Sequence, residues 1–298
     1  MAGIDCKNNT ANSPNSHPLA FTLYGLTPGP AFSAPSGICV DSANNLYVAD
    51  TGNHRILKYD SNGNWLMTIQ GPFNPAPPAG LPNQFNQPEA IAIDNAGNIY
   101  VSDADQANQP AIFVFSNTGA YLTNWGDTVG AGQLLQPGRL TVSGGQVYVS
   151  DDGHNRIAYF SAPGGVYAGA VGGTYGSNLG ELHTPDSVEI DAAGNIYVGD
   201  RGNSRVEIFT PAGTAVSIWG ANQIDPTGLA FDISGNLWVV NGSSTALSEF
   251  NSGGSLVQTW SPDGYPDVSD AAFDNTGAIW VSFVGNGVEY PRVEKFSH

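Results

Sequence analysis

The sequence predicts an all-β fold, a six-bladed β-propeller of four-stranded antiparallel blades. Three observations lead to this prediction. One pattern of apolar and turn residues recurs six times along the 298 residues, 38 glycines and 20 prolines permit many tight turns, and 41% of the residues are hydrophobic, which is enough for a large core. The spacing of 41 to 53 residues between repeats leaves room for four short strands and their turns.

Each repeat starts with a short apolar strand and passes through a turn of the type Asp-x-x-Gly-Asn into a second strand, a polar loop and two further strands. The repeats begin at Pro35, Pro88, Pro137, Pro185, Pro226 and Val268. In the turns at 94–98 and 191–195, we expect the Asp side chain to cap the turn and the Gly to supply a positive φ. These turns lack the ligand spacing of an EF-hand, which argues against calcium loops.

The loop after the second strand carries an Asp and an Arg five residues apart in three repeats. These pairs are Asp50 with Arg55, Asp151 with Arg156, and Asp200 with Arg205. Hydrogen bonds between two charged groups are short and strong. We therefore expect each pair to clamp its loop rather than to take part in catalysis.

The last repeat offers only three clear strands, whereas residues 18–25, before the first repeat, have the pattern of a lone fourth strand. We expect this N-terminal strand to complete the final blade, which closes the ring and removes an open sheet edge. Residues 1–16 are polar and without periodicity, which predicts a flexible tail. The predicted organisation is thus a tail over 1–16 and one propeller over 17–298.

The first repeat reads PSGICVDSANNLYVADTGNHRILKYD and resembles the repeats of the NHL-repeat family. The resemblance extends over about residues 19–298 and is strongest in the first and fourth repeats. It is weakest in the last two, where Asn241 replaces the Asp at the end of the second strand. The resemblance implies a six-bladed propeller. Similarity to propellers in general implies ligands at the channel mouth or on the face with the longest loops, 71–87, 126–136 and 172–184.

The charge of the chain disfavours nucleic acid and anionic membranes as partners. Nine Lys and Arg residues stand against 26 Asp and Glu residues, so the net charge is −17. RNA binding, which the resemblance to some animal NHL-repeat domains would suggest, needs a basic face that this composition does not provide. No apolar run approaches the ~20 residues of a membrane-spanning helix.

We expect an exported protein, either secreted, periplasmic or on the cell surface. Only three lysines are present, and the polar residues are mainly Asn, Ser, Thr and Gly. The start of the sequence shows no signal peptide, so this expectation assumes that a signal has been removed.

The two cysteines, Cys6 and Cys39, leave two interpretations open. Cys39 stands where other repeats have small residues and would pack as a small buried thiol, with Cys6 as a stray one. Alternatively, a disulfide between them would hold the tail over the channel mouth.

Comparison of matched positions in the first strands identifies charged residues that the fold does not require. Arg139, Glu189 and Asp270 stand where small residues are the rule. One interpretation is an interblade salt bridge between Arg139 and Glu189, because a buried charge has to be paired. The other is a ligand or metal site at the channel mouth, formed by Glu89, Arg139, Asp186, Glu189, Asp270 and His183. The arginine would oppose a cation, so we predict no cofactor, with a divalent metal as the alternative.

The sequence lacks a nucleophile elbow, a phosphate-binding loop and a His-x-x-x-His zinc spacing. We therefore predict a non-catalytic extracellular binding scaffold that recognises a protein, peptide or glycan through its loop-rich face. The alternative is a metal-assisted hydrolase or lyase with a site at the channel mouth. It rests on a resemblance to six-bladed lactonases and streptogramin lyases, whose metal ligands we do not find in this sequence.

Overall fold

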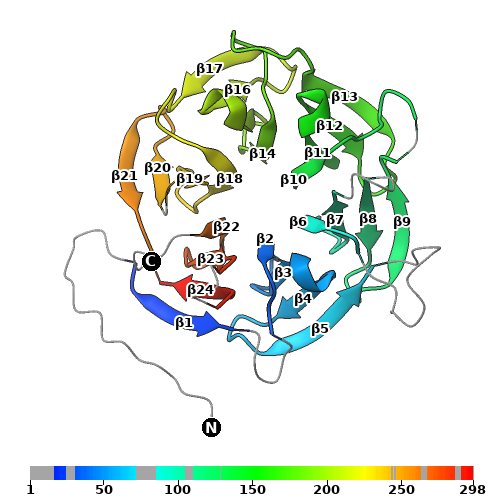
Figure 1. The fold of residues 1–298 in the computed structure, drawn as a ribbon, viewed down its shortest axis with the longest axis vertical. Coiled ribbons are helices and arrows are strands. Elements are labelled where there is room, and N and C mark those ends of the chain that lie inside the picture. The colour runs from blue at the N-terminus through cyan, green and yellow to red at the C-terminus, as the bar shows by residue number, and fades with distance from the viewer. Residues whose placement is uncertain are drawn as a thin grey trace.

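The computed structural model describes residues 17–24, 31–71, 85–104, 110–127, 129–242, 244, 246–262, 267–285 and 290–297. The predicted tail over 1–16, Cys6 and most of the connection over 71–87 lie outside the described residues. The described chain forms six four-stranded antiparallel sheets in a closed ring (Figure 1). The predicted all-β, six-bladed propeller is therefore confirmed.

Each blade runs from an innermost strand near the axis of the ring to an outer strand at its rim (Figure 1). The first three blades consist of β2 (Pro35–Val40), β3 (Leu46–Asp50), β4 (Arg55–Tyr59) and β5 (Trp65–Gln70); β6 (Pro88–Ile93), β7 (Ile99–Asp103), β8 (Ala111–Phe115) and β9 (Tyr121–Trp125); and β10 (Pro137–Ser143), β11 (Gln146–Asp151), β12 (Arg156–Ser161) and β13 (Tyr167–Gly172). The last three consist of β14 (Pro185–Ile190), β15 (Ile196–Asp200), β16 (Arg205–Phe209) and β17 (Ala215–Trp219); β18 (Pro226–Phe231), β19 (Leu237–Asn241), β20 (Leu247–Phe250) and β21 (Leu256–Trp260); and β22 (Val268–Phe273), β23 (Ile279–Phe283) and β24 (Arg292–Phe296) with β1 (Leu19–Leu23).

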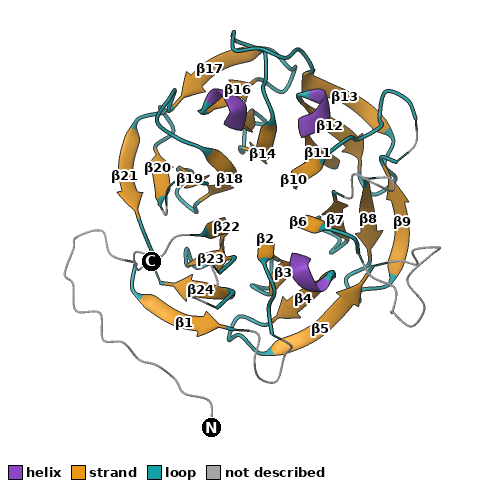
Figure 2. Cartoon of the chain, viewed as in Figure 1, coloured by secondary structure: helices purple, strands orange, loops and turns teal. Residues whose placement is uncertain are grey.

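Short 3₁₀ helices follow the second strand of the first, third and fourth blades (Figure 2). They are η1 (Thr51–Asn53), η2 (Asp152–His154) and η3 (Arg201–Asn203). Within the described residues, no helix is long and apolar enough to cross a membrane.

The N-terminal strand completes the last blade, as predicted. β1 pairs with β24 in antiparallel register, with Leu19 opposite Phe296 and Leu23 opposite Val293. Beside this pair, the Ser297 amide donates a hydrogen bond to the Pro18 carbonyl at 2.9 Å. Pairing between two distant parts of the chain therefore closes the ring.

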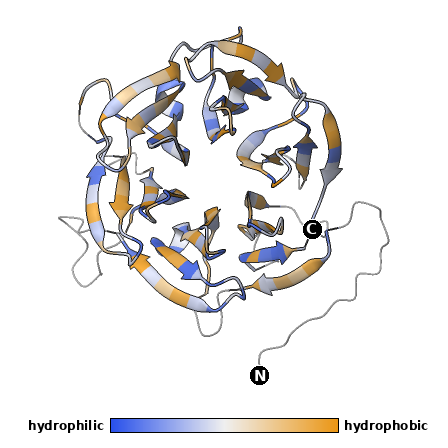
Figure 3. Ribbon diagram, turned by 180° about the vertical axis from the view of Figure 1, so that it is seen from behind, coloured by the Kyte–Doolittle hydropathy of each residue, from blue (hydrophilic) through white to orange (hydrophobic). Residues whose placement is uncertain are grey.

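The hydrophobic core lies between the blades rather than on the axis. In the described residues, each of six clusters of buried side chains joins two neighbouring blades. Between the first and second blades, for example, Tyr47 and Ile56 pack with Ile91 and Phe115. Hydrophobic and hydrophilic residues alternate along many strands (Figure 3), so each sheet can present apolar side chains to its neighbour. Every blade therefore depends on the blades at both of its sides.

The predicted Asp–Arg clamps form, and they tie together two sets of loops. The distance from the Arg Nε to the carboxylate is 2.7 Å for Asp50–Arg55, 2.8 Å for Asp151–Arg156 and 2.7 Å for Asp200–Arg205. The other oxygen of Asp200 accepts a hydrogen bond from the His183 amide, in the connection from the previous blade, at 2.8 Å. The loops after the second strands and the connections between blades therefore share one face, which we call the loop face.

The opposite face, which we call the turn face, carries the hairpin turns between the first and second strands. In the turn at 94–98, Asp94 accepts a hydrogen bond from the Asn98 amide at 2.8 Å, and Gly97 has a φ of +83°. The expected turn chemistry is thus present. Glycine suits this position because a residue with a side chain would be strained at a positive φ.

Removal of β1 is expected to destabilise the whole ring. A chain lacking residues 1–24 leaves the edge of β24 unpaired and uncovers Trp280, which is buried and lies edge-on to Phe21 at 5.3 Å. We expect a clear fall in the urea midpoint, measured by tryptophan fluorescence. A chain lacking only residues 1–16, which keeps β1, is the matched control. Equal midpoints for the two truncations would contradict this role of β1.

Candidate functional site

A bulge in every innermost strand determines which residues face the axis. The register between β2 and β3 shifts between Pro35 and Ile38, and a shift at the same place occurs in the other five blades. Side chains at the second, third and fifth positions of these strands consequently line two cavities on the axis. The mouth cavity, on the loop face, has a volume of about 520 Å³. The inner chamber, toward the turn face, has a volume of about 220 Å³.

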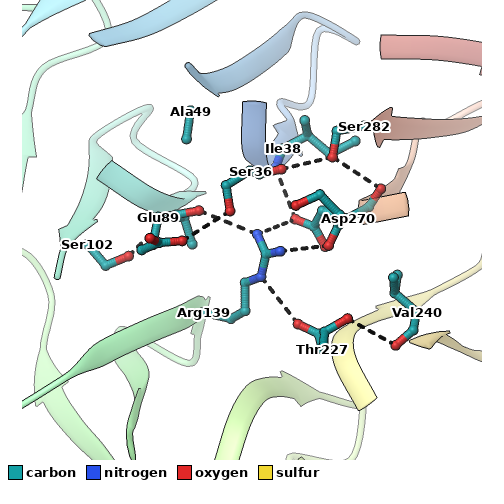
Figure 4. A network of polar contacts seen from close by, with 12 residues as sticks. Ser36, Ile38, Ala49, Glu89, Ser102, Arg139, Thr227, Val240, Asp270 and Ser282 are labelled. Carbon is teal, nitrogen blue, oxygen red and sulfur yellow. Dashed lines mark hydrogen bonds and ion pairs between the residues drawn. The ribbon is translucent and has the colours of Figure 1, made fainter. Parts of the chain in front are cut away.

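Arg139, the third residue of β10, separates the two cavities, and of the described residues it alone lines both. Its guanidinium crosses the axis to other blades (Figure 4). Nη1 lies 3.0 Å from the Asp270 carboxylate, and Nη2 donates to the Ser269 carbonyl at 2.8 Å. Longer hydrogen bonds of 3.4 Å reach the carbonyls of Glu89 and Thr227. One side chain of the third blade thus links the second, fifth and sixth blades.

The predicted salt bridge between Arg139 and Glu189 is wrong, because the two residues lie at different depths. Arg139 pairs with Asp270, and both are the third residue of their strand. Glu189 is the fifth residue of β14 and lies deeper, in the inner chamber, where it accepts a hydrogen bond from the Thr141 hydroxyl at 3.3 Å. Burial raises the pKa of Asp270, although the positive charge of Arg139 opposes this shift.

The mouth cavity is lined by polar residues from equivalent positions of different blades. Glu89 and Asp186 are the second residues of β6 and β14, and Asp152 and Arg201 are the first residues of η2 and η3. Asp267 directly precedes β22. Four carboxyl groups therefore line this cavity, together with the guanidinium groups of Arg139 and Arg201.

Two of these carboxyl groups have an oxygen that is buried and has no hydrogen-bond partner within the described part of the chain. They are Oδ1 of Asp152 and Oδ2 of Asp267. Burial raises the pKa of Asp152 to about 8, and the negative charges of Asp186 and Asp151 contribute to this shift. Such a group gains stability when a donor, above all a cationic one, approaches it.

Arg201 is engaged at the rim of the mouth. Its side chain lies between the carboxylates of Asp186, at 3.1 Å, and Asp225, at 2.9 Å. The guanidinium of Arg139 is held by Asp270. Both positive charges are thus paired, and the mouth keeps an excess of carboxyl groups.

Exposed apolar side chains stand on the loop face, and one of them lies next to the mouth. Leu135 adjoins Gln136, which lines the cavity, and packs over Gly153 next to Asp152. Tyr175 is 66% exposed. The same two connections between blades also expose Val129 and Leu179. Exposed apolar side chains on the loop face offer contact area to a partner protein.

The structure brings only some of the predicted site residues together. Glu89, Arg139 and Asp186 share the mouth cavity, whereas Glu189 and Asp270 line the inner chamber. His183 lines neither of these cavities: its ring lies 4.6 Å from that of Tyr175, centre to centre.

Sequence comparison missed Asp152 and Arg201, although a signal was present. The residues directly after the six second strands are Thr51, Ala104, Asp152, Arg201, Gly242 and Val284. Five of these six line the mouth cavity, and two of them are charged where the others are uncharged. Alignment of this loop position across the repeats would have identified both.

In the described residues, no group of three or more His, Cys, Asp or Glu side chains is arranged to hold a metal ion. The acidic residues of the mouth are spread over separate blades, and Arg201 lies among them.

Fold and repeats together define a six-bladed β-propeller. Residues 32–59 match the family described as NHL repeat. NHL repeat-containing protein 2 of Bos taurus is 42% identical over 92 residues, which are 29% of this chain and 12% of that protein. Protein brain tumor of Drosophila melanogaster is 28% identical over 148 residues, 49% of this chain and 13% of that protein. The chain is thus a six-bladed β-propeller whose first repeat matches the NHL repeat, as the sequence of that repeat indicated.

The chain spans only 11 to 13% of the length of the first curated relatives it matches. Solved structures resemble it over more of its length. A gluconolactonase from Xanthomonas campestris has a TM-score of 0.69 at 15% identity, covering 96% of this chain and 93% of that one. Virginiamycin B lyase from Staphylococcus aureus has a TM-score of 0.61 at 12% identity, covering 89% and 85%. At these identities the likeness shows the fold alone.

Loss of Arg139 is expected to destabilise the protein by leaving Asp270 buried without its partner. Arg139→Met should lower the free energy of unfolding by about 3 kcal/mol, measured by urea denaturation. The double variant Arg139→Met, Asp270→Asn should recover part of that loss, because no uncompensated charge remains. If the double variant is no more stable than the single one, the pairing with Asp270 is not what Arg139 contributes.

Asp152 should make the stability of the fold fall as the pH rises. Its pKa is raised from 3.8 to about 8, so the folded state holds a proton that the unfolded state has lost between these values. The free energy of unfolding of the wild-type protein, relative to that of Asp152→Asn, should fall progressively as the pH rises from 3.8 to about 8, and it should stay at its lower value above that interval. Denaturation of both proteins over the interval tests this, and a difference independent of pH would exclude it.

Proposed function

We propose that the protein is a non-catalytic binding scaffold whose mouth cavity takes a lysine or arginine side chain of a partner protein or peptide. The observation that carries this proposal is a pair of buried carboxyl oxygens in one cavity, on Asp152 and Asp267, that have no hydrogen-bond partner among the described residues. Glu89 and Asp186 line the same cavity and add to its acidity.

The energetics favour a cationic donor. A buried acceptor without a hydrogen bond costs about 1–3 kcal/mol, and a ligand that supplies the donor removes this cost. A cationic ligand favours the ionised form of Asp152, whose pKa is otherwise about 8, and hydrogen bonds between an ammonium or guanidinium group and a carboxylate are roughly twice as strong as neutral ones. The net charge of −17 also attracts a basic partner over longer distances.

The apolar side chains of the loop face support a protein or peptide as the partner rather than a glycan. Leu135 and Tyr175 offer exposed apolar surface on this face, and Leu135 directly precedes Gln136, which lines the cavity. A peptide with apolar residues beside a basic one would cover these side chains while its charged group enters the mouth.

Binding of short peptides tests the proposal. Four blocked peptides with a central Arg, Lys, Gln or Glu between Leu and Tyr are titrated into the full chain by calorimetry. The Arg or Lys peptide should bind at least about tenfold more tightly than the Gln peptide, equivalent to about 1.4 kcal/mol, and added salt should weaken it. Equal affinity for the Gln peptide would overturn the proposal.

Matched variants locate the binding. The double variant Asp152→Asn, Asp267→Asn should lose most of the affinity for the basic peptide. The variant Asp191→Asn, Asp232→Asn makes the same two substitutions in turns on the turn face and should retain it. Equal losses in both would mean that only net charge matters, which contradicts a mouth site.

The hydrolase or lyase alternative is separated by a different readout. Wild-type protein is incubated with lactones and streptogramins, with and without Mg²⁺. Saturable turnover that disappears in the Asp152→Asn, Asp267→Asn variant would replace the binding proposal with a catalytic one.

A further inference from the structure

The inner chamber is a second, separate cavity that the proposed function does not use. The innermost strands of all six blades line it, and Arg139 stands between it and the mouth. At the fifth position of these strands the side chains are Cys39, Ala92, Thr141, Glu189, Ala230 and Ala272. Glu189 is thus the single carboxyl group in a ring of small side chains.

Glu189 has unused hydrogen-bonding capacity. Its Oε2 accepts hydrogen bonds from the Ile190 amide at 3.0 Å and from the Thr141 hydroxyl at 3.3 Å. Within the described chain, no donor reaches Oε1. A carboxylate that lines a cavity and keeps one oxygen without a donor presents that oxygen to whatever enters.

No counter-charge is available to Glu189 inside the chamber. The other charged or titratable residues that line it are Cys39, Arg139 and Asp270. Arg139 and Asp270 pair with each other at 3.0 Å. Burial raises the pKa of the Cys39 thiol to about 12, so this group is neutral.

The size and walls of the chamber select the kind of ligand. An engineered apolar cavity of about 150 Å³ binds benzene, so about 220 Å³ accommodates a slightly larger molecule. Ala92, Ala230 and Ala272 supply apolar wall, and Phe231 and Phe273 follow nearer the turn face. A compact hydrocarbon group would therefore replace water at these walls with a gain in free energy.

We propose that the inner chamber binds a small organic ammonium ion, with its N–H groups donating to Oε1 of Glu189 and its hydrocarbon group among the alanine and phenylalanine side chains. The ligand enters from the turn face, since Arg139 closes the side toward the mouth.

The affinity of this site should increase with pH. Burial raises the pKa of Glu189 to about 7. Below that value the carboxyl group is protonated and uncharged, so it attracts an ammonium ion poorly. As the pH rises through about 7, the carboxylate forms and binding strengthens for as long as the amine stays protonated.

The test uses n-butylammonium chloride as the probe, with n-butanol and butyrate as uncharged and oppositely charged controls of similar size. Calorimetric titration of the full chain carrying Asp152→Asn and Asp267→Asn, which removes binding of this lysine analogue in the mouth, should show saturable binding of butylammonium, at least tenfold tighter at pH 8 than at pH 6, and no binding of butyrate. Binding of butanol as tight as that of butylammonium would overturn the proposal.

Variants assign the site. Glu189→Gln keeps the shape of the side chain, removes its charge, and should weaken butylammonium binding at least about tenfold. Ala230→Val narrows the chamber without touching Glu189 and should also weaken it, which keeps the proposal testable if the first variant does not fold. The mouth variant Asp152→Asn, Asp267→Asn should keep the binding of butylammonium that depends on Glu189, because this ion, an analogue of the lysine side chain, loses only its binding in the mouth. If instead the mouth variant loses binding and Glu189→Gln retains it, the chamber is not the site.

Discussion

The closed ring is the constraint on which the rest of the structure depends. The hydrophobic clusters lie between neighbouring blades, so a blade without a neighbour on one side would expose half of its apolar contacts. The last blade obtains its fourth strand from the other end of the described chain, through the pairing of β1 with β24. Since these contacts hold each sheet at its two faces, the innermost strands are positioned by cores that lie outside the channel. The residues that face the axis are consequently free to differ from blade to blade.

This freedom allows charges at the axis that a packed core would not accept. Arg139 is satisfied by one carboxylate and by carbonyl groups of three other blades, so it serves as a cross-link as well as a partition. On one side of it, Asp152 and Asp267 keep buried oxygens without donors. On the other side, Glu189 has no opposite charge within reach in the described chain. A single paired arginine thus divides one channel into two acidic compartments of different size, one polar and one with apolar walls.

The sequence predicted the fold better than the candidate site, and the reason is physical. Turn and clamp residues such as Gly97 and Asp200 have their role in a turn or an ion pair that spans only a few residues. Their spacing in the sequence therefore reveals that role. The pairing of Arg139 depends instead on which side chains of other blades lie at the same depth across the axis, and no spacing along the sequence encodes that distance. Glu189 was expected as the partner because it is a charged residue of the next blade, but it lies deeper along the axis. His183 was expected at the mouth, yet it contributes its backbone amide rather than its ring, and this amide donates a hydrogen bond to the clamp residue Asp200.

The strand pair that closes the ring also determines how the molecule responds to a mechanical load. Leu19 lies opposite Phe296, so the segment before β1 and the segment after β24 leave the sheet at the same end. A pulling force applied through these two segments acts along the direction of the interstrand hydrogen bonds and reaches them one after another. The pair therefore opens like a zipper, at a lower force than if all its hydrogen bonds were sheared together. A ring whose blades are each held by cores at both faces is in this sense easy to open by tension on its ends.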